Sequence, residues 1–208
     1  MKNNIEWIFF DVGSTLVNEE KVYCHRLQDI ADAAGEPFEK IYNMAIDLYK
    51  NNKKGDLELT RKYKVSGSKW YLEEEELFED TEETLKALSP KYKIGIIANQ
   101  SLGTAERLEK FGIKKYIDLI IASAEEGVEK PDKRIFNIAL SKASCNPENA
   151  VMIGDRIDND IVPAKELGMK TIWIKQGFGK YWNITGENEI PDEEINSLSE
   201  LKERFFIS

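Results

Sequence analysis

The feature that most restricts the fold is an alternation of short apolar runs with amphipathic segments along the 208-residue chain. Each run is rich in β-branched or aromatic residues and nearly continuous in hydrophobicity, as is typical of strands buried on both faces of a parallel sheet. The runs are Ile5–Phe10, Ile94–Ala98, Ile117–Ala122, Val151–Ile153 and Thr171–Ile174. Segments with the apolar spacing of helices separate the later runs. One of them, Thr104–Phe111, ends at Gly112, and glycine is a favoured residue at the end of a helix. The alternation predicts an α/β fold with a doubly wound, mainly parallel, Rossmann-like sheet.

The stretch between the first run and residue 78 breaks this alternation, because it contains no convincing strand pattern. Amphipathic helices are expected at Val22–Ala34, Pro37–Lys50 and Thr60–Lys64. We therefore predict a core domain made of residues 1–17 and 79–208, with a helical cap subdomain, residues 18–78, inserted after the first strand. Asn18–Glu20 and Glu79–Thr81 are the predicted linkers.

The C-terminal end predicts one more helix. Residues Glu193–Phe206 place four apolar side chains on one helical face, namely Ile195, Leu198, Leu201 and Phe205.

Charge and composition exclude several classes of protein. The net charge is −9, and no long Lys/Arg block is present, which argues against nucleic acid as a main partner. No apolar stretch is long enough to span a bilayer, so we expect no membrane partner and a cytoplasmic location. Cys24 and Cys145 lack metal-ligand spacing, and the single histidine, His25, excludes a multi-histidine zinc site. A monomer or a weak homodimer is expected.

Polar side chains gather where the predicted strands end. Ligands of open α/β sheets bind at the carboxyl ends of the strands, so these residues are candidates for one common site. In chain order they are Asp11, Gly13, Thr15, Asn99, Lys130, Asp155 and Asp160.

Several carboxylates at one place repel one another unless a cation is present. Mg²⁺ binds oxygen ligands and is the usual companion of phosphate. Lys130 would supply a second positive charge for phosphate oxygens, and Asp11 could then act as a nucleophile. The set predicts a site for Mg²⁺ and a small phosphorylated metabolite.

Four motifs in chain order carry a family resemblance. They are Phe9–Leu16; Ile96–Asn99; Ser123–Pro131 with Ile135-Phe136; and Gly154–Asp160 with Ala164 and Gly168-Met169. With these motifs the chain resembles the haloacid dehalogenase-like hydrolase superfamily, and within it the subfamily with a helical C1-type cap after motif one. The resemblance covers nearly the whole chain and implies a Mg²⁺-dependent phosphatase that works through an aspartyl-phosphate intermediate.

The resemblance also implies a role for each residue. Asp11 would be both nucleophile and metal ligand, and the Gly13 carbonyl and Asp155 would be further ligands. Asp160 would ligate the metal or hold Asp155. Lys130 would neutralise the phosphoryl oxygens, while Thr15 and Asn99 would hydrogen-bond the phosphate or the nucleophile loop. The cap would exclude water and select the substrate.

Two positions depart from the family pattern. Phosphatases of the family usually carry a second aspartate, the general acid and base, where this chain has Gly13, and a Ser or Thr where it has Ala98. Loss of a general acid slows turnover by about 10²–10⁴-fold unless another group replaces it.

These departures leave alternatives open. One is a catalytically weak phosphate-binding homologue, in which Gly13→Asp would raise the rate. Another is a dehalogenase, which needs no metal and therefore gives Asp155 and Asp160 no role. A third is a phosphonate-cleaving hydrolase, which would need a cap lysine such as Lys21 or Lys40 as Schiff base.

Overall fold

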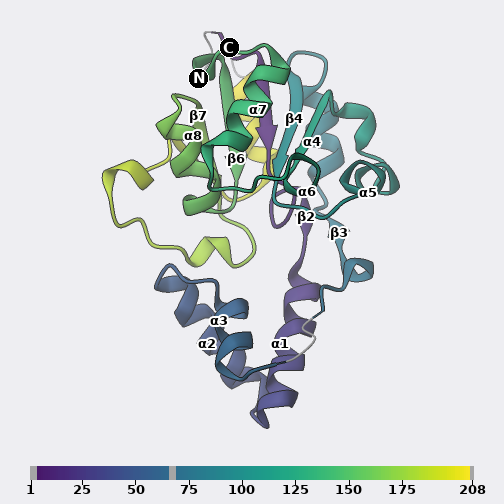
Figure 1. The fold of residues 1–208 in the computed structure, drawn as a ribbon. Coiled ribbons are helices and arrows are strands. Elements are labelled where there is room, and N and C mark those ends of the chain that lie inside the picture. The colour runs from purple at the N-terminus through teal and green to yellow at the C-terminus, as the bar shows by residue number, and fades with distance from the viewer. Residues whose placement is uncertain (1–3, 66–68, 207–208) are drawn as a thin grey trace.

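The core of the molecule is a six-stranded parallel sheet with strand order β5-β4-β1-β6-β7-β8. It lies in the upper lobe of Figure 1, where β4, β6 and β7 are labelled. The computed structural model describes residues 4–65 and 69–206. The strands are β1 Trp7–Phe10, β4 Lys93–Ala98, β5 Leu119–Ala122, β6 Ala150–Gly154, β7 Lys170–Ile174 and β8 Glu193–Ile195. The predicted α/β fold with a parallel sheet is confirmed.

Strand β1 lies in the middle of this sheet, between β4 and β6. Phe10, its last residue, is in register with Ile96 on one side and with Ile153 on the other. The chain segments that follow β1, β4 and β6 therefore leave the sheet at the same edge and close to one another.

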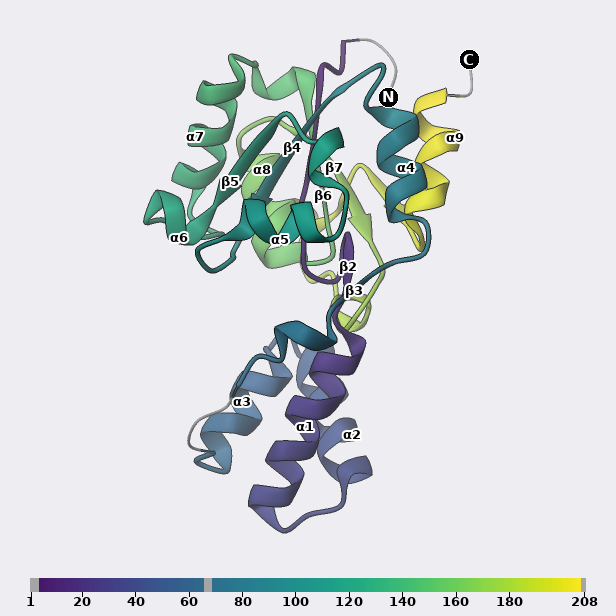
Figure 2. The ribbon, with the colours of Figure 1, turned by 90° about the vertical axis from the view of Figure 1, so that its right-hand side faces the viewer.

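Helices cover both faces of the sheet (Figure 2). On one face Ile8 and Phe10 pack with α4 (Thr81–Leu88), α5 (Thr104–Lys110) and α9 (Leu201–Phe206). On the other face Phe9 packs with α7 (Lys133–Ala143) and α8 (Val162–Glu166). Successive side chains of a strand point to opposite faces, so β1 contributes fully buried side chains to both cores. The short helix α6, Ser123–Glu126, follows β5.

Three helices form a separate lobe beyond the carboxyl edge of the sheet (Figures 1 and 2). They are α1 Glu20–Ala34, α2 Phe38–Lys50 and α3 Gly55–Lys62. The chain enters the lobe through β2, Val17–Asn18, and leaves it through β3, Glu76–Leu77, and these two short strands pair antiparallel. We call residues 18–78 the cap. Its division from the core at residues 17/18 and 78/79 stays a prediction.

The cap has its own apolar interior, which continues onto the core domain. Leu27, Ile30 and Ile41 pack in one cluster with Trp173 and Phe178, which lie on and just after β7. The lobe is therefore anchored by side-chain packing as well as by the β2–β3 connection.

The predicted helix Glu193–Phe206 is wrong in its first part. Glu193–Ile195 forms the edge strand β8 beside β7, and helix α9 begins only at Leu201. The four predicted apolar side chains are nonetheless buried in the core. A three-residue strand is too short to show a period of its own, so the helical spacing of the buried residues concealed it.

The pair β2–β3 was also not predicted, because the sequence of the cap showed no strand pattern. Over residues 4–65 and 69–206, no helix has the length and apolar character needed to cross a membrane.

Candidate active site

Asp11 and Asp155 stand at the ends of adjacent strands. The Asp11 N–H donates to the Ile153 carbonyl at 2.9 Å, which extends the β1–β6 pairing by one residue beyond β1. The Trp173 indole N–H donates to the Asp155 carbonyl at 2.8 Å and holds the main chain just after β6. Sheet register and this side-chain bond thus fix the main chain beneath both carboxylates.

Asp160 reaches the same place from a helical turn, Ile157–Ile161, that follows β6. Its N–H donates to the Arg156 carbonyl at 2.8 Å, and its Oδ2 accepts from the Arg156 N–H at 3.0 Å. Gly154 makes room for it, because a Cβ built on Gly154 would lie 2.6 Å from the Asp160 Cβ. Only glycine allows this close approach.

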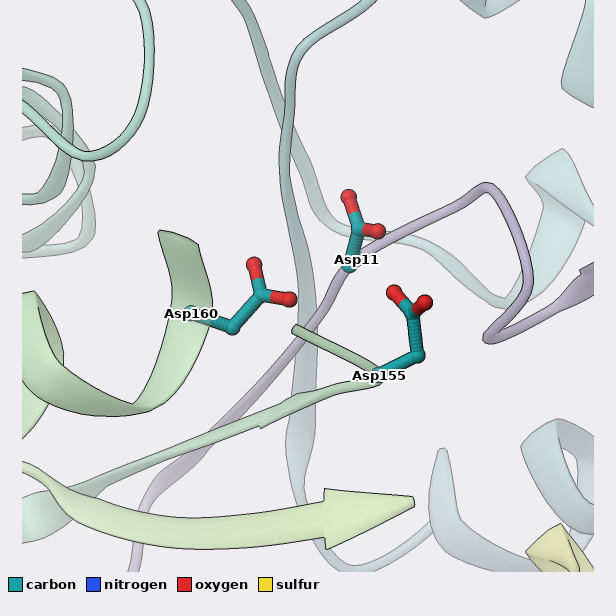
Figure 3. A group of neighbouring side chains, drawn as sticks. All are labelled: Asp11, Asp155 and Asp160. Atoms are coloured by element: carbon teal, nitrogen blue, oxygen red, sulfur yellow. The ribbon is translucent and has the colours of Figure 1, made fainter. Parts of the chain in front are cut away.

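The three carboxyl groups converge (Figure 3). One oxygen from each of Asp11, Asp155 and Asp160 lies within 4.8 Å of the other two. The sequence-based expectation that these acids meet therefore agrees with the geometry, whereas their roles stay predictions.

Lys130 lies against this cluster. Its Nζ donates to Asp11 Oδ1 and to Asp160 Oδ1, each at 2.6 Å, and the residue is 3% exposed. Asn99 holds both main-chain polar groups of Lys130: Asn99 Nδ2 donates to the Lys130 carbonyl at 2.8 Å, and the Lys130 N–H donates to Asn99 Oδ1 at 2.7 Å. In this structure Asn99 therefore positions the lysine.

The remaining predicted residues are placed differently. Gly13 lines a cavity next to the acid cluster. Thr15 is fully buried, is not a wall residue of that cavity, and its Oγ1 has no hydrogen-bond partner among the described residues. A direct contact of Thr15 with phosphate stays a prediction.

The electrostatics of the cluster fit a divalent cation. Burial, with the nearby charges of Asp11 and Asp160, holds the pKa of Asp155 well above its usual range. Burial also raises the pKa of Asp160 to about 6, although Lys130 opposes the shift. Burial alone would lower the pKa of Lys130, but Asp11 and Asp160 outweigh it and shift that pKa upward.

One ammonium group thus faces three buried or half-buried acids, which leaves excess negative charge among oxygen donors. A hard ion such as Mg²⁺ matches this donor set.

A cavity of about 520 Å³ opens above the cluster, and core and cap both line it. The core contributes Asp11, Asn99, Lys130 and Asp155, among others. The cap side contributes mainly larger side chains, namely Glu19, Tyr23, Tyr49, Trp70 and Leu72. Two further cations, Arg107 and Arg156, also line the wall.

Glu19 is the site residue that sequence reasoning missed, because it falls in a predicted linker. The side chain is buried and reaches back to the loop that follows Asp11, where Ser14 Oγ donates to Glu19 Oε2 at 3.0 Å. Burial, followed by the charge of Asp11, raises the pKa of Glu19 from 4.5 to about 8, against the opposing hydrogen bond from Ser14. The sequence did offer one signal: an acidic residue, Glu19, follows shortly after Gly13, the position at which phosphatases of the family usually carry an aspartate.

The chain is similar in sequence to known proteins. The sequence model of the haloacid dehalogenase-like hydrolase family matches residues 8–174. The chain is 32% identical to the glyceraldehyde 3-phosphate phosphatase of Pyrococcus furiosus over 226 aligned positions, which cover 96% of this chain and 92% of the relative.

Solved structures share the fold. The Bacillus subtilis hydrolase YfnB, solved bound to magnesium, superposes with a TM-score of 0.69 at 19% identity, covering 99% of this chain and all of the other. The 2-haloacid dehalogenase of Pseudomonas syringae gives 0.64 at 22% identity, covering 96% and 97%. A protein named as a dehalogenase thus shares this fold, so the fold alone does not choose between phosphatase and dehalogenase activity.

Proposed function

Because this chain belongs to the haloacid dehalogenase-like hydrolase family, we propose that it hydrolyses phosphate monoesters of small metabolites with Asp11 as nucleophile and Mg²⁺ as cofactor. The predicted hydrolase of phosphatase type is confirmed at the level of the family and of a phosphatase relative of nearly equal length. The residue roles, the metal and the substrate are the proposal.

The observation that carries the proposal is the pairing of Asp11 with Lys130. The lysine Nζ lies 2.6 Å from Asp11 Oδ1, so a positive charge stands beside the carboxylate that would attack phosphorus. A phosphoryl group at Asp11 would meet Lys130, which would neutralise charge on its oxygens.

The chemistry has two stages. Asp11 attacks phosphorus and the bond from phosphorus to the leaving oxygen breaks, which gives an aspartyl phosphate. Water then attacks that phosphorus, Asp11 leaves as a carboxylate, and inorganic phosphate is released. Asp11, Asp155, Asp160 and the Gly13 carbonyl are the proposed holders of Mg²⁺, which when bound supplies positive charge to the phosphate.

The cavity suggests the class of substrate. Its base is acidic and cationic, whereas its cap side is largely aromatic. A phosphate on a small organic group matches this division, and the glyceraldehyde 3-phosphate phosphatase relative makes a triose phosphate the first compound to test. The cytoplasmic location and the monomer or weak homodimer stay predictions.

The alternatives have less support. Lys21 forms an exposed ion pair with Glu76 and Lys40 forms one with Glu36, and neither is among the cavity-lining residues, so no observation favours a Schiff base. A dehalogenase needs no metal, which would leave the converging acids Asp155 and Asp160 without a role.

The test is phosphate release from a panel of small phosphate monoesters, with and without Mg²⁺, using wild type and Asp11→Asn. We expect release by wild type only with Mg²⁺, and none by Asp11→Asn. Calorimetric Mg²⁺ binding, lost in Asp155→Asn, is an independent readout. Equal release by wild type and Asp11→Asn would reject the proposal, as would chloride release from 2-chloropropionate without phosphate release.

A further inference from the structure

The carboxyl group of Glu19 fills the space that an aspartate side chain at position 13 would occupy. If a Cβ is built on Gly13, the Glu19 carboxyl carbon and Oε2 each lie 2.7 Å from it, and Oε1 is nearer still. The carboxyl carbon of an aspartate at position 13 would stand one bond, about 1.5 Å, beyond that Cβ. An aspartate at position 13 and the Glu19 carboxyl would therefore compete for the same volume.

Glu19 is placed there by the local fold. It directly precedes α1, immediately after the β2–β3 pair, and its carbonyl accepts from the Tyr23 N–H in the first turn of that helix. The side chain is 7% exposed and lines the same cavity as Asp11.

The two carboxyl oxygens of Glu19 have different surroundings. Oε2 accepts the hydrogen bond from Ser14 Oγ. Oε1, the atom nearest to the Gly13 position, has no hydrogen-bond partner among residues 4–65 and 69–206. One oxygen is thus held in place while the other is free to exchange a proton with a bound molecule.

We propose that Glu19 is the general acid and base of this hydrolase, in place of the aspartate that phosphatases of the family usually carry at the position of Gly13. This rests on the proposed phosphatase function. In the first stage the Glu19 carboxyl proton moves to the leaving oxygen as its bond to phosphorus breaks, which releases the alcohol. In the second stage Glu19 takes a proton from the water that attacks the aspartyl phosphate, which restores the starting state.

The same geometry reverses the expectation that Gly13→Asp accelerates a slow homologue. An aspartate at position 13 would have to displace the Glu19 carboxyl group from its observed position, so Gly13→Asp should be slower than wild type. The pair Gly13→Asp/Glu19→Ala removes the crowding and returns an acid to the loop, so it should be faster than Glu19→Ala alone.

The experiment compares Glu19→Gln with wild type on two substrates. Glutamine keeps the size and can accept from Ser14, but it transfers no proton. 4-Nitrophenyl phosphate has a leaving group that needs no protonation, whereas the best alkyl phosphate of the panel does need it.

We expect the rate for the alkyl phosphate to fall by about 10²–10⁴-fold. The nitrophenol burst from 4-nitrophenyl phosphate should remain, and intact mass spectrometry should show a phosphoryl group accumulating on Glu19→Gln but not on Asp11→Asn/Glu19→Gln. Thermal unfolding of each variant shows that it is folded.

The outcomes separate the two proposals. If wild type is faster than Asp11→Asn on none of the substrates, the proposed phosphatase function and the proposed role of Glu19 are both overturned. Turnover by wild type, with Glu19→Gln equally slowed on both substrates and no phosphoryl-enzyme, would overturn the Glu19 role alone. Wild-type rates in Glu19→Ala, or a faster Gly13→Asp, would have the same consequence.

Discussion

The base of the cavity and its cap side are built by different forces. At the base, Asp11 and Asp155 are held by main-chain pairing of adjacent central strands and by the Trp173 bond, and Lys130 is fixed by Asn99. On the cap side, Tyr23 and Tyr49 lie on helices that are positioned by side-chain packing and by one short strand pair.

This difference suggests a division of labour. Main-chain hydrogen bonds set atoms within narrow limits, which a reaction at phosphorus requires. Helix packing tolerates changes of side chain at similar volume, which suits a wall that selects substrates. Glu19 lies where the two regions join, so the proposed acid is positioned by both.

The largest effect is expected at the base. Lys130→Met leaves Asp11 and Asp160 without their buried partner, so the free energy of unfolding should fall by ~3–5 kcal/mol. Phosphatase activity should fall by about 10²–10³-fold, because the charge proposed to neutralise the phosphoryl oxygens is lost.

Urea unfolding and phosphate release measure these two effects. The matched control is Lys133→Met, which removes an ion pair with Glu166 at the surface and should change little. Equal destabilisation by the two variants would contradict the assignment of Lys130 to a buried cluster.

A second prediction concerns an ion pair and a hydrogen bond whose residues all belong to the cap. Asp56 pairs with Arg26 at 3.0 Å and accepts from the Tyr49 hydroxyl at 3.1 Å, all within the cap. Asp56→Ala should cost ~3 kcal/mol because it leaves a buried guanidinium unpaired.

The Michaelis constant should rise, because Tyr49 lines the cavity, whereas calorimetric Mg²⁺ affinity should stay unchanged. Asp47→Ala on the exposed face of α2 is the control. Loss of Mg²⁺ affinity in Asp56→Ala would show that cap and base are not separable.

A third prediction concerns pH and the residue at the junction. The pKa of Glu19 is raised from 4.5 to about 8, so the folded protein keeps a proton that the unfolded chain releases. The resulting stability is complete below pH 4.5 and is lost as pH rises toward 8.

Without divalent ions, the free energy of unfolding should therefore decrease across this interval. It should decrease less in Glu19→Gln, whose side chain does not titrate, although Asp155 and Asp160 contribute in the same direction. Denaturant unfolding at several pH values measures the slopes, and parallel curves would contradict the raised pKa.

The smallest effect is expected at the outer surface of the cap. Lys21 is mostly exposed and its partner Glu76 is half-exposed, so Lys21→Ala should change neither stability nor turnover measurably. Borohydride treatment with phosphonoacetaldehyde should trap no imine. A trapped imine that disappears in Lys21→Ala would revive phosphonate cleavage.

The sequence predicted the core of the fold well and its margins less well. The central strands show nearly continuous apolar runs, and the acids that follow them meet because parallel strands end at one edge. Strand β8 was missed because three residues carry no period, and the helical spacing around them pointed to a helix.

Glu19 was missed for another reason. Its importance depends on the distance from its carboxyl group to the Gly13 loop, and chain order reports no such distance. The partnership of Asn99 with Lys130 was unforeseen for the same reason, because two loops far apart in sequence create it.

The amino-acid sequence by itself determined the parallel α/β core, the helical insertion and the identity of the acids and the lysine at the strand ends. These follow from local periodicity and from the geometry of parallel sheets. Only the tertiary structure decided which carboxyl group fills the space at Gly13, which side chains form the cavity walls and how Lys130 is held. Such contacts join residues distant in the chain, and their energy depends on distances and burial that no local pattern encodes.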